Sequence, residues 1–406
     1  MSILVINAGS SSLKFGLFDA EARQSLATGL IDWRNDPRQA ELVIHPSKGE
    51  PICSRESVAD HRAAVRHAIR RLGELSNASG DAAKTIAVVG HRVVHGGTRF
   101  QEPVRIDAQV KKEIAKLVEL APLHNPAALE AIEAAENALP RVPHVAVFDT
   151  SFFAELPPHA YVYPVPYAWF RDWGIRRFGF HGISHAYCTT RAAELMGRDA
   201  SGLHLVICHL GNGCSASAVR GGRAVQTTMG YTPMEGLMMG TRSGSLDPGI
   251  LLHVQRRFNL SADQIDHALN HQSGLLGVSG ISSDYRQVKA AADKGEGQAR
   301  LALAIFADRV RATVGALAVT MGGIDALVFT AGIGEHAADL RAAVCEGLRI
   351  LGLRLDSDRN TSCAPDADIA SADSPGRILV LRTQEEQMIA REARRVMSGA
   401  SLHLSQ

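Results

Sequence analysis

Five short motifs place a histidine, an arginine or an aspartate among glycines, prolines and other small residues. They occupy residues 90–97, 122–126, 148–152, 178–185 and 239–244. A single arginine beside a glycine is more often a solvated loop residue or a helix cap. Five such motifs in a chain of average composition instead indicate a site built from loops on a rigid scaffold. Since the planar fork of arginine matches carboxylates and phosphates, we expect anionic ligands.

Asp149 directly follows the apolar segment 142–148, which is expected to be a buried strand. A carboxylate at the C-terminal end of such a strand is a suitable ligand for a hard cation. Aspartate is equally suited to cap the N-terminus of a following helix, so this alternative stays open.

Three glycine-rich segments have the composition of a phosphate or nucleotide site. Residues 7–12, with Lys14 after them, combine backbone N–H groups, three serine hydroxyls and an ammonium, although an ordinary hairpin turn fits them as well. Residues 209–213 follow an apolar segment and are also compatible with a hairpin turn. Residues 332–337 match the G-x-G-x-x-A form of the dinucleotide fingerprint, with Asp356 roughly twenty residues further on, which is the basis for an alternative interpretation as a dehydrogenase.

Composition limits the class of protein. The 406 residues carry 43 Lys and Arg against 42 Asp and Glu, so no general field attracts nucleic acid or an anionic membrane. The six cysteines show no zinc-site spacing and are expected to be reduced thiols of a cytosolic protein. No basic region precedes the short apolar run at the N-terminus, so we expect no signal peptide. The apolar stretch 312–334 is interpreted as the end of a helix and a buried strand, because Gly322, Gly323 and Asp325 interrupt it.

Hydrophobic periodicity predicts strands that alternate with helices. A hairpin of residues 3–6 and 13–17 is expected first, followed by buried strands at 85–89, 142–148, 203–208, 326–330 and 378–381. Helices are expected at 126–138, 185–196, 263–270, 298–321, 336–351 and 385–397. This order predicts an α/β fold with mixed sheets. Two halves that each open with a strand and a Gly/Ser turn, at 7–12 and 211–217, suggest a duplicated lobe, with a boundary near the proline-rich segment 156–166.

Eight motifs, in the same order across nearly the whole chain, closely resemble the acetate kinase family. They are Val-Ile-Asn-Ala-Gly-Ser-Ser-Ser-Leu-Lys, Gly-His-Arg-Val-Val-His-Gly-Gly, Leu-Ala-Pro-Leu-His-Asn-Pro, Val-Phe-Asp-Thr-Ser-Phe, Phe-Gly-Phe-His-Gly-Ile-Ser-His, His-Leu-Gly-Asn-Gly, Met-Gly-Thr-Arg-Ser-Gly and Phe-Thr-Ala-Gly-Ile-Gly-Glu. The resemblance implies two ribonuclease-H-like lobes of the actin, sugar kinase and Hsp70 fold group, with a cleft between them. Residues 1–150 and 385–406 would form the N-terminal lobe with a C-terminal helix, and residues 151–384 the second lobe with the nucleotide site.

The resemblance also implies an activity and its partners. A cytoplasmic homodimer would convert ATP and acetate reversibly into ADP and acetyl phosphate with Mg²⁺, or with Mn²⁺ in its place, and without nucleic acid or membrane. The residues implied to hold the metal are Asn7 and Glu385, and those implied in catalysis are Arg92, Asp149, His181 and Arg242. The residues implied to bind the substrate are Arg92, Val94, Leu123, Phe180 and Pro233. The residues implied to bind the nucleotide are Lys14, His209, Leu210, Gly211, Asn212, Gly213, Asp284, Tyr285, Arg286, Gly332, Ile333, Gly334, Glu335 and His336.

One position departs from the family's pattern. The family usually has Thr-Asn-Glu-Glu, whereas Gln384 replaces that asparagine here, which makes Glu386 the neighbour able to replace Glu385.

The implied mechanism is consistent with elementary chemistry. A carboxylate substrate is already ionised at pH 7 and needs no general base, so catalysis must supply positive charge and alignment for direct in-line transfer. We expect Arg92 to hold the carboxylate, and Arg242 and His181 to stabilise the phosphoryl oxygens. A phosphorylated Asp149 stays open as an alternative. So do a propionate kinase, an NAD-dependent dehydrogenase and a non-catalytic ATP-binding protein of the Hsp70 type.

Overall fold

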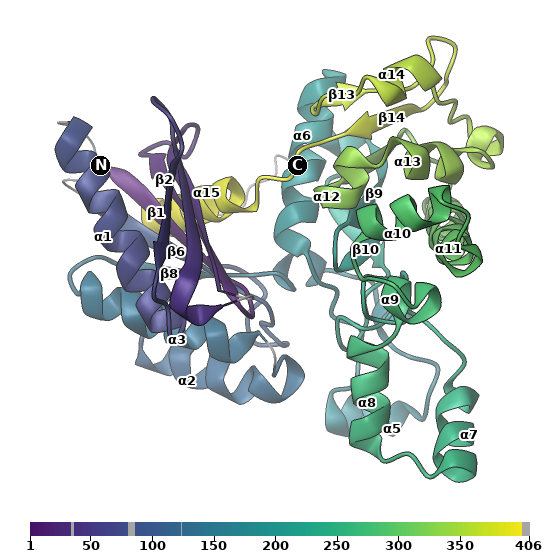
Figure 1. Ribbon diagram of the computed structural model, residues 1–406, viewed down its shortest axis with the longest axis horizontal. Coiled ribbons are helices and arrows are strands. Elements are labelled where there is room, and N and C mark those ends of the chain that lie inside the picture. Colours follow the sequence, from purple (N-terminus) through teal and green to yellow (C-terminus); the bar gives the residue numbers. More distant parts are fainter. Residues whose placement is uncertain (34–35, 80–85, 123, 400–406) are drawn as a thin grey trace. The chain divides into compact units, whose positions relative to one another are not determined.

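The computed structural model describes residues 1–33, 36–79, 86–122 and 124–399 (Figure 1). Two compact units make up the chain, one comprising Met1–Ala154 and Gln384–Gln406, the other Glu155–Thr383. No helix in the described part of the chain is long and apolar enough to cross a bilayer.

The first unit is built on an eight-stranded sheet. Its strands lie in the order β5 (Ile52–Glu56), β4 (Ala40–Pro46), β3 (Ser25–Asp32), β2 (Ser12–Asp19), β1 (Ser2–Ala8), β6 (Ile86–Val93), β8 (His144–Phe148) and β7 (Val104–Arg105). The antiparallel pairing of β1 with β2 confirms the expected hairpin, and it places Asn7 opposite Lys14. Strands β1, β6 and β8 are parallel neighbours, so their carboxyl ends meet at one edge of the sheet.

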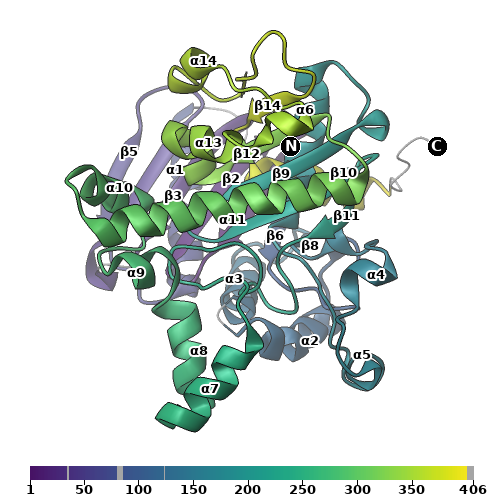
Figure 2. The ribbon, with the colours of Figure 1, turned by 90° about the vertical axis from the view of Figure 1, so that its right-hand side faces the viewer.

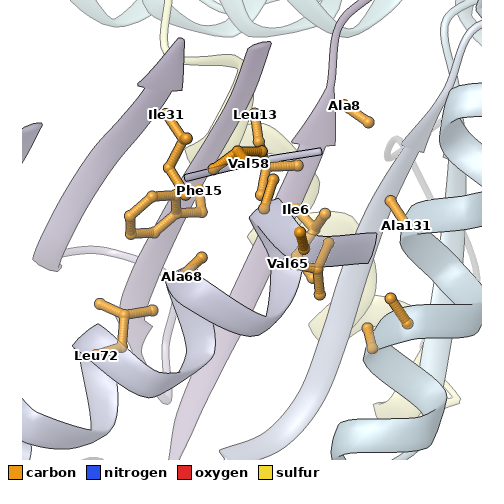
Figure 3. Packing of buried hydrophobic residues seen from close by; sticks show 14 of the residues in the cluster. Ile6, Ala8, Leu13, Phe15, Ile31, Val58, Val65, Ala68, Leu72 and Ala131 are labelled. Carbon is orange, nitrogen blue, oxygen red and sulfur yellow. The ribbon is translucent and has the colours of Figure 1, made fainter. Parts of the chain in front are cut away.

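Helices cover both faces of this sheet. On one side lie α1 (His61–Ser79) and α3 (Asn125–Ala138), with α2 (Ala108–Lys116) beside α3, and on the other lies α15 (Glu385–Ser398) (Figure 1). Apolar side chains from α1 and from the strands interdigitate in the core, among them Phe15, Ile31, Val65 and Leu72 (Figure 3). The sheet therefore supplies a rigid platform for residues at its edge.

The second unit repeats the same strand arrangement. Its sheet has the order β11 (Arg223–Thr227), β10 (Cys214–Arg220), β9 (His204–Leu210), β12 (Ala326–Thr330), β14 (Arg377–Val380) and β13 (Ala367–Asp368). The pairs β9–β10 and β10–β11 are antiparallel, whereas β9–β12 and β12–β14 are parallel. The same sequence of directions runs through β3, β2, β1, β6 and β8. The expected duplication of the lobe is therefore confirmed.

Helices of the second unit differ in how they lie relative to its sheet. Helix α11 (Gly297–Met321) crosses strands β9 and β10, while α7 (Pro248–Phe258) and α8 (Ala262–His271) project away from the sheet (Figure 2). The remaining helices are α4 (Pro158–Tyr161), α5 (Tyr167–Trp173), α6 (Gly182–Met196), α9 (Gly274–Ser279), α10 (Tyr285–Asp293), α12 (Ala331–His336), α13 (Ala338–Cys345) and α14 (Ser357–Thr361).

Most predicted elements are confirmed, including the division of 312–334 into the end of α11 and strand β12. The single helix predicted over 336–351 is wrong: α12 ends at His336, α13 ends at Cys345, and a 3₁₀ turn follows at Leu348–Leu351. Ala337 breaks the helix, because its backbone (φ −92°, ψ 83°) lies outside the helical region. The Gly/Ser turn predicted over 211–217 is too long, since β10 already begins at Cys214. The strand predicted over 85–89 continues to Val93, and its Thr85 lies outside the described residues.

Candidate active site

Asn7, Arg92 and Asp149 form one hydrogen-bonded group in the first unit. Arg92 donates to Asp149 Oδ2 from both Nε (3.1 Å) and Nη2 (2.6 Å), and it donates from Nη1 to Asn7 Oδ1 (3.2 Å). The Asp149 carboxylate is buried, so this ion pair is shielded from water. The interpretation of Asp149 as a helix cap is wrong, because the following 3₁₀ turn begins after Thr150 and Asp149 pairs with Arg92 instead.

Three parallel strands bring this group together. Asn7 lies in β1 and Arg92 in β6, each one residue before the end of its strand, and Asp149 directly follows β8. Because these strands are adjacent, their carboxyl ends place the three side chains side by side, as is usual for ligand sites of α/β sheets. The expectation that Asn7 and Arg92 belong to loops is therefore wrong: both are fixed by strand hydrogen bonds.

Two carboxylates of α15 complete the group. Asn7 Nδ2 lies 3.0 Å from Glu386 Oε1 and 3.5 Å from Glu385 Oε2. Burial by itself would lower the pKa of Arg92, but the nearby carboxylates of Asp149, Glu385 and Glu386 raise it above its ordinary value. Gln384 is exposed at the N-cap position and makes no capping hydrogen bond, so the acidic first turn itself compensates the helix N-terminus.

Oxygen atoms of this group suit a hard divalent cation. Carboxylate and amide oxygens are the ligands that Mg²⁺ prefers, and Glu385, Glu386 and Asn7 carry such oxygens, although Asn7 faces the two carboxylates with Nδ2 while its Oδ1 accepts from Arg92. Among the described residues no group of three or more His, Cys, Asp or Glu has the form of a metal site.

A short turn joins β1 to β2 next to this group. The Gly9 N–H donates to Ser12 O (2.8 Å), and the ring of His61 is hydrogen-bonded through Nε2 to Gly9 O (2.7 Å). Lys14, across the hairpin from Asn7, is exposed. The turn thus presents serine hydroxyls and an ammonium at the same sheet edge as Arg92.

His181 and Arg242 lie together in the second unit. A Cβ atom at Gly213 would lie 3.3 Å from His181 Nε2 and 3.4 Å from Arg242 Nη2, so only a glycine leaves both side chains their present positions without a shift. Arg242 donates from Nη1 to the carbonyl oxygen of Pro233 (2.6 Å). His181 adopts a left-handed backbone (φ 59°, ψ 24°) at the N-cap of α6, a strained conformation for a non-glycine residue that is typical of functional sites.

A buried network behind His181 was not predicted from the sequence. Ser215 Oγ lies 3.0 Å from His181 Nδ1 and 2.8 Å from His185 Nε2, and Ser217 Oγ lies 2.8 Å from His185 Nδ1. A signal for it exists in the sequence: alternation along β10 puts both serines on one face, and the two histidines are one helical turn apart.

A second network joins two of the expected nucleotide segments. The ring of His209 stacks on that of His181, with 4.2 Å between centroids, and its Nδ1 lies 2.8 Å from Ser184 Oγ. Ser184 in turn contacts Thr383 Oγ1 (2.9 Å), whose backbone N–H donates to Glu335 Oε1 (3.1 Å).

The other expected nucleotide residues differ in exposure. Asn212, Arg286, Gly332 and His336 are exposed, Gly211, Gly213, Asp284 and Ile333 are half-buried, and Leu210, Tyr285 and Gly334 are buried. Asp284 caps α10 by accepting from the Arg286 backbone N–H (2.9 Å). The Tyr285 hydroxyl donates to Asp339 (3.1 Å), which anchors that helix in the unit.

The dinucleotide interpretation of residues 332–337 is wrong. Gly332 and Gly334 lie inside helix α12, which starts directly at the end of β12, and not in a loop ahead of a helix. Asp356 caps α14 by accepting from the backbone N–H groups of Asp358 and Arg359. The two parts of the apparent fingerprint therefore have separate structural explanations.

Of the residues expected around the substrate's apolar part, Val94 and Phe180 are buried and Pro233 is half-buried. Val94 directly follows β6, two residues after Arg92, and Phe180 directly precedes His181. Leu123 lies outside the described residues.

Comparison with known proteins finds the same family over nearly the whole chain. Residues 2–391 match the model of the acetokinase family. An acetate kinase of Gloeobacter violaceus is 51% identical over 402 residues, which cover 97% of this chain and 98% of the relative. The crystal structure of Porphyromonas gingivalis acetate kinase superposes with a TM-score of 0.88 at 38% identity, covering 98% of this chain and 99% of that one. A propionate kinase from Francisella tularensis superposes with a TM-score of 0.89 at 38% identity, covering 97% and 99%.

Proposed function

This chain belongs to the acetokinase family, and we propose how its residues carry out the ATP-dependent phosphorylation of acetate. The reaction forms a bond between a carboxylate oxygen and the γ-phosphorus, and it breaks the bond between that phosphorus and the bridging oxygen to ADP. Acetyl phosphate and ADP are the products, and the reaction is reversible. The observation that carries the proposal is the pairing of Arg92 with buried Asp149 at the ends of adjacent strands.

Arg92 binds the acetate carboxylate in this proposal. Its guanidinium is held from one side by Asp149 and from another by Asn7, so its position is fixed before substrate arrives. An acetate ion is already deprotonated at neutral pH, which removes the need for a general base. Asp149 therefore serves to orient Arg92 and to balance its charge, and transfer is direct and in line.

Arg242 supplies positive charge to the phosphoryl oxygens during transfer, and the ring of His181 donates a hydrogen bond to them. Burial lowers the pKa of Arg242 from its ordinary value, but a guanidinium stays protonated throughout the physiological range. Charge in a partly buried site acts more strongly than in water, and the carbonyl of Pro233 fixes the guanidinium by a hydrogen bond.

Asn7, Glu385 and Glu386 would hold Mg²⁺. When bound, the ion would neutralise negative charge on the phosphates of ATP. Both carboxylates lie within 3.5 Å of Asn7 Nδ2, and that of Glu386 is the nearer of the two. We therefore propose that Glu386 contributes as well as Glu385. The backbone of residues 209–213, 284–286 and 332–336, with Lys14, would bind ATP, since these segments combine glycines, helix starts and a cation.

The test is a carboxylate series. Purified protein, ATP and Mg²⁺ are incubated with acetate, propionate or butyrate, and the acyl phosphate is trapped as its hydroxamate, with a reaction lacking acid as the control. We expect the highest kcat/KM with acetate. ATP hydrolysis without any acid-dependent hydroxamate would overturn the proposal.

A propionate kinase is the second candidate. One solved relative of the same similarity carries that description, and buried apolar side chains such as Val94 and Phe180 suit either acid. One methylene changes the free energy of transition-state binding by only about 1–3 kcal/mol, so the two activities differ in degree. A higher kcat/KM with propionate than with acetate in the same series would favour this candidate.

We also propose a homodimer in the cytoplasm. None of the residues of α5, α7 and α8 is buried, and several large apolar side chains of α5 and α7 are exposed, such as Trp173 (64%) and Phe258 (63%). Such exposed aromatics are typical of association surfaces. Light scattering should give twice the mass of one chain, and the double variant Trp173→Glu, Phe258→Glu should have the mass of a single chain.

The cysteines support the proposed cytoplasmic location. All six cysteines are free, as in proteins of reducing compartments.

A further inference from the structure

We infer that His185, acting through Ser215, is a positioning residue that fixes the tautomer of His181 so that its Nε2 carries a proton. The inference rests on the proposed function, since it explains how His181 can stabilise a phosphoryl oxygen. The connection is a chain of four side chains, Ser217, His185, Ser215 and His181, supplied alternately by β10 and by the start of α6.

The chain is short, and among its four side chains only that of His181 is partly exposed. Its three contacts measure 2.8 to 3.0 Å, and Ser215, Ser217 and His185 are fully buried. At these distances each contact is a normal hydrogen bond. Because Ser215, Ser217 and His185 are fully buried, the direction in which each hydroxyl points is set by its neighbours in the chain.

Counting protons leaves the chain two orientations. A serine hydroxyl donates one hydrogen bond, so when Ser215 donates within the chain it donates to one ring and accepts from the other. Burial, together with the neighbouring His209, holds the pKa of His185 well below its ordinary value, so its ring is neutral and has one N–H. Whether His181 Nδ1 donates to Ser215 or accepts from it therefore sets the direction of the other two hydrogen bonds of the chain.

The surroundings of His181 select between these orientations. Its Nε2 lies on the side of Gly213 that also faces Arg242. The positive charge of the Arg242 guanidinium therefore disfavours a positive charge on the His181 ring. A neutral ring can donate to a phosphoryl oxygen from Nε2 only when Nδ1 accepts. In that orientation Ser215 donates to His181, His185 donates from Nε2 to Ser215, and Ser217 donates to His185 Nδ1. In the opposite orientation Nε2 would present a lone pair to an anion.

The tautomer is measured directly by ¹⁵N NMR of the histidine-labelled protein without ligands. A protonated ring nitrogen resonates far from an unprotonated one, and the His181 signals are assigned from their loss in His181→Asn. We expect an unprotonated Nδ1 and a protonated Nε2 at His181 in the wild-type protein. A protonated Nδ1 would overturn the inference. Because this readout needs no turnover, it decides the inference even if the carboxylate series fails.

Kinetics test the same chain in the active enzyme. Ser215→Ala should lower kcat by about 10- to 100-fold while the KM for acetate and for ATP stays within about threefold, as expected for loss of an orienting partner. His185→Gln keeps a donor towards Ser215 and should retain most of the kcat that His185→Leu loses. Equal losses for Gln and Leu, or a kcat for Ser215→Ala within about twofold of wild type, would contradict the inference.

Thr189→Val is the matched control. Thr189 is buried one turn after His185 on α6, and its hydroxyl donates to the His185 carbonyl oxygen (2.8 Å) without joining the chain. Removing this hydroxyl disturbs the same helix but no hydrogen bond to a ring. We expect its kcat and its His181 spectrum to match wild type. A loss of kcat as large as that of Ser215→Ala would show that any buried hydroxyl on this face matters, which contradicts a specific relay.

Discussion

Arg92 directs two N–H groups at a single carboxylate oxygen of Asp149, at 3.1 and 2.6 Å, although the two residues are 57 positions apart. The parallel register of β6 and β8 produces this arrangement, since Arg92 pairs with Val147 and Asp149 follows that strand by one residue. With Asp149 buried and Arg92 only 17% exposed, the pair behaves as one unit, and removing either partner leaves a charge without its counterpart.

The first prediction concerns the guanidinium fork of Arg92. Arg92→Ala is expected to lower kcat/KM for acetate by roughly 10²–10⁴-fold, the scale of losing one electrostatic stabiliser. Arg92→Lys keeps the positive charge but cannot donate to Asp149 and Asn7 from a planar fork, so most of the loss should persist. The hydroxamate assay gives the rates, and circular dichroism confirms that both variants are folded. A loss of less than about tenfold for Arg92→Ala would contradict the assigned role.

The second prediction concerns acid specificity. Val94 is buried directly after β6, two residues from Arg92, so a smaller side chain there should enlarge the space for the acyl group. Val94→Ala is expected to raise the ratio of kcat/KM for propionate to that for acetate by about 10-fold, within the 1–3 kcal/mol that a methylene contributes. An unchanged ratio, with both acids affected equally, would show that Val94 does not line the acyl site.

The sequence predicted the type and place of most of the elements it named, because their periodicity signals were strong, but strands β3, β4, β5 and β11 and the strand orders were not predicted. The opening hairpin, α3, α11 and β12 all lie where alternation or helical spacing puts them. The break within 336–351 was missed because the apolar spacing continues across it, while the interruption depends on the backbone of Ala337. Local conformation of a single residue is not encoded in a periodic pattern.

Candidate residues were predictable by type but not by partner. Arg92 and Asp149 stood out beside glycines and at a strand end, yet only the register of β6 and β8 shows that they pair. Ser215 escaped notice because serine in a Gly/Ser-rich stretch suggests a turn, whereas it lies on a buried strand facing two histidines. Long-range pairing of polar groups depends on the tertiary fold.

The third prediction concerns stability below neutral pH. His91 and His144 are buried, their rings stack, and Nε2 of one lies 2.9 Å from Nδ1 of the other. Burial, together with the neighbouring His144, lowers the pKa of His91 strongly; burial also lowers that of His144, and it lowers that of His95 to about 4. Folded, these rings stay neutral, whereas the unfolded chain takes up protons below about pH 6.5.

Below about pH 6.5 the unfolded state binds more protons than the folded state, so the free energy of unfolding should fall as the pH decreases. Above about pH 6.5 these histidines should change the free energy of unfolding little. Each such histidine contributes up to about 1.4 kcal/mol per pH unit until its folded pKa is reached. Urea unfolding between pH 8 and pH 5 measures the slope. The double variant His91→Leu, His144→Leu should show a shallower slope, and its stability at pH 8 isolates the effect of packing. An unaltered slope would show that this pair is not a source of acid sensitivity.

The last prediction compares the same substitution at two glycines. A Cβ atom at Gly230 would lie 1.7 Å from Glu235 Oε2 and 2.1 Å from the Tyr163 hydroxyl, which are hydrogen-bonded to each other. Arg177 also binds Glu235 (2.7 Å), and this group holds the segment that carries Pro233, the hydrogen-bond acceptor of Arg242. Gly230→Ala should cost about 1–3 kcal/mol of stability, and by displacing Arg242 it should lower kcat by about 10- to 100-fold.

Gly315→Ala is the opposite case. Gly315 lies inside α11 with no atom within 4 Å of the position that a Cβ would take. Since glycine is a poor helix former and the space is open, the substitution should stabilise the protein by about 0.5–1 kcal/mol and leave kcat unchanged. Thermal unfolding and the hydroxamate assay on both variants test the pair. A Gly230→Ala variant as active and as stable as Gly315→Ala would show that the Glu235 and Tyr163 side chains do not hold Arg242 in place, because they could then move aside at no cost to the reaction.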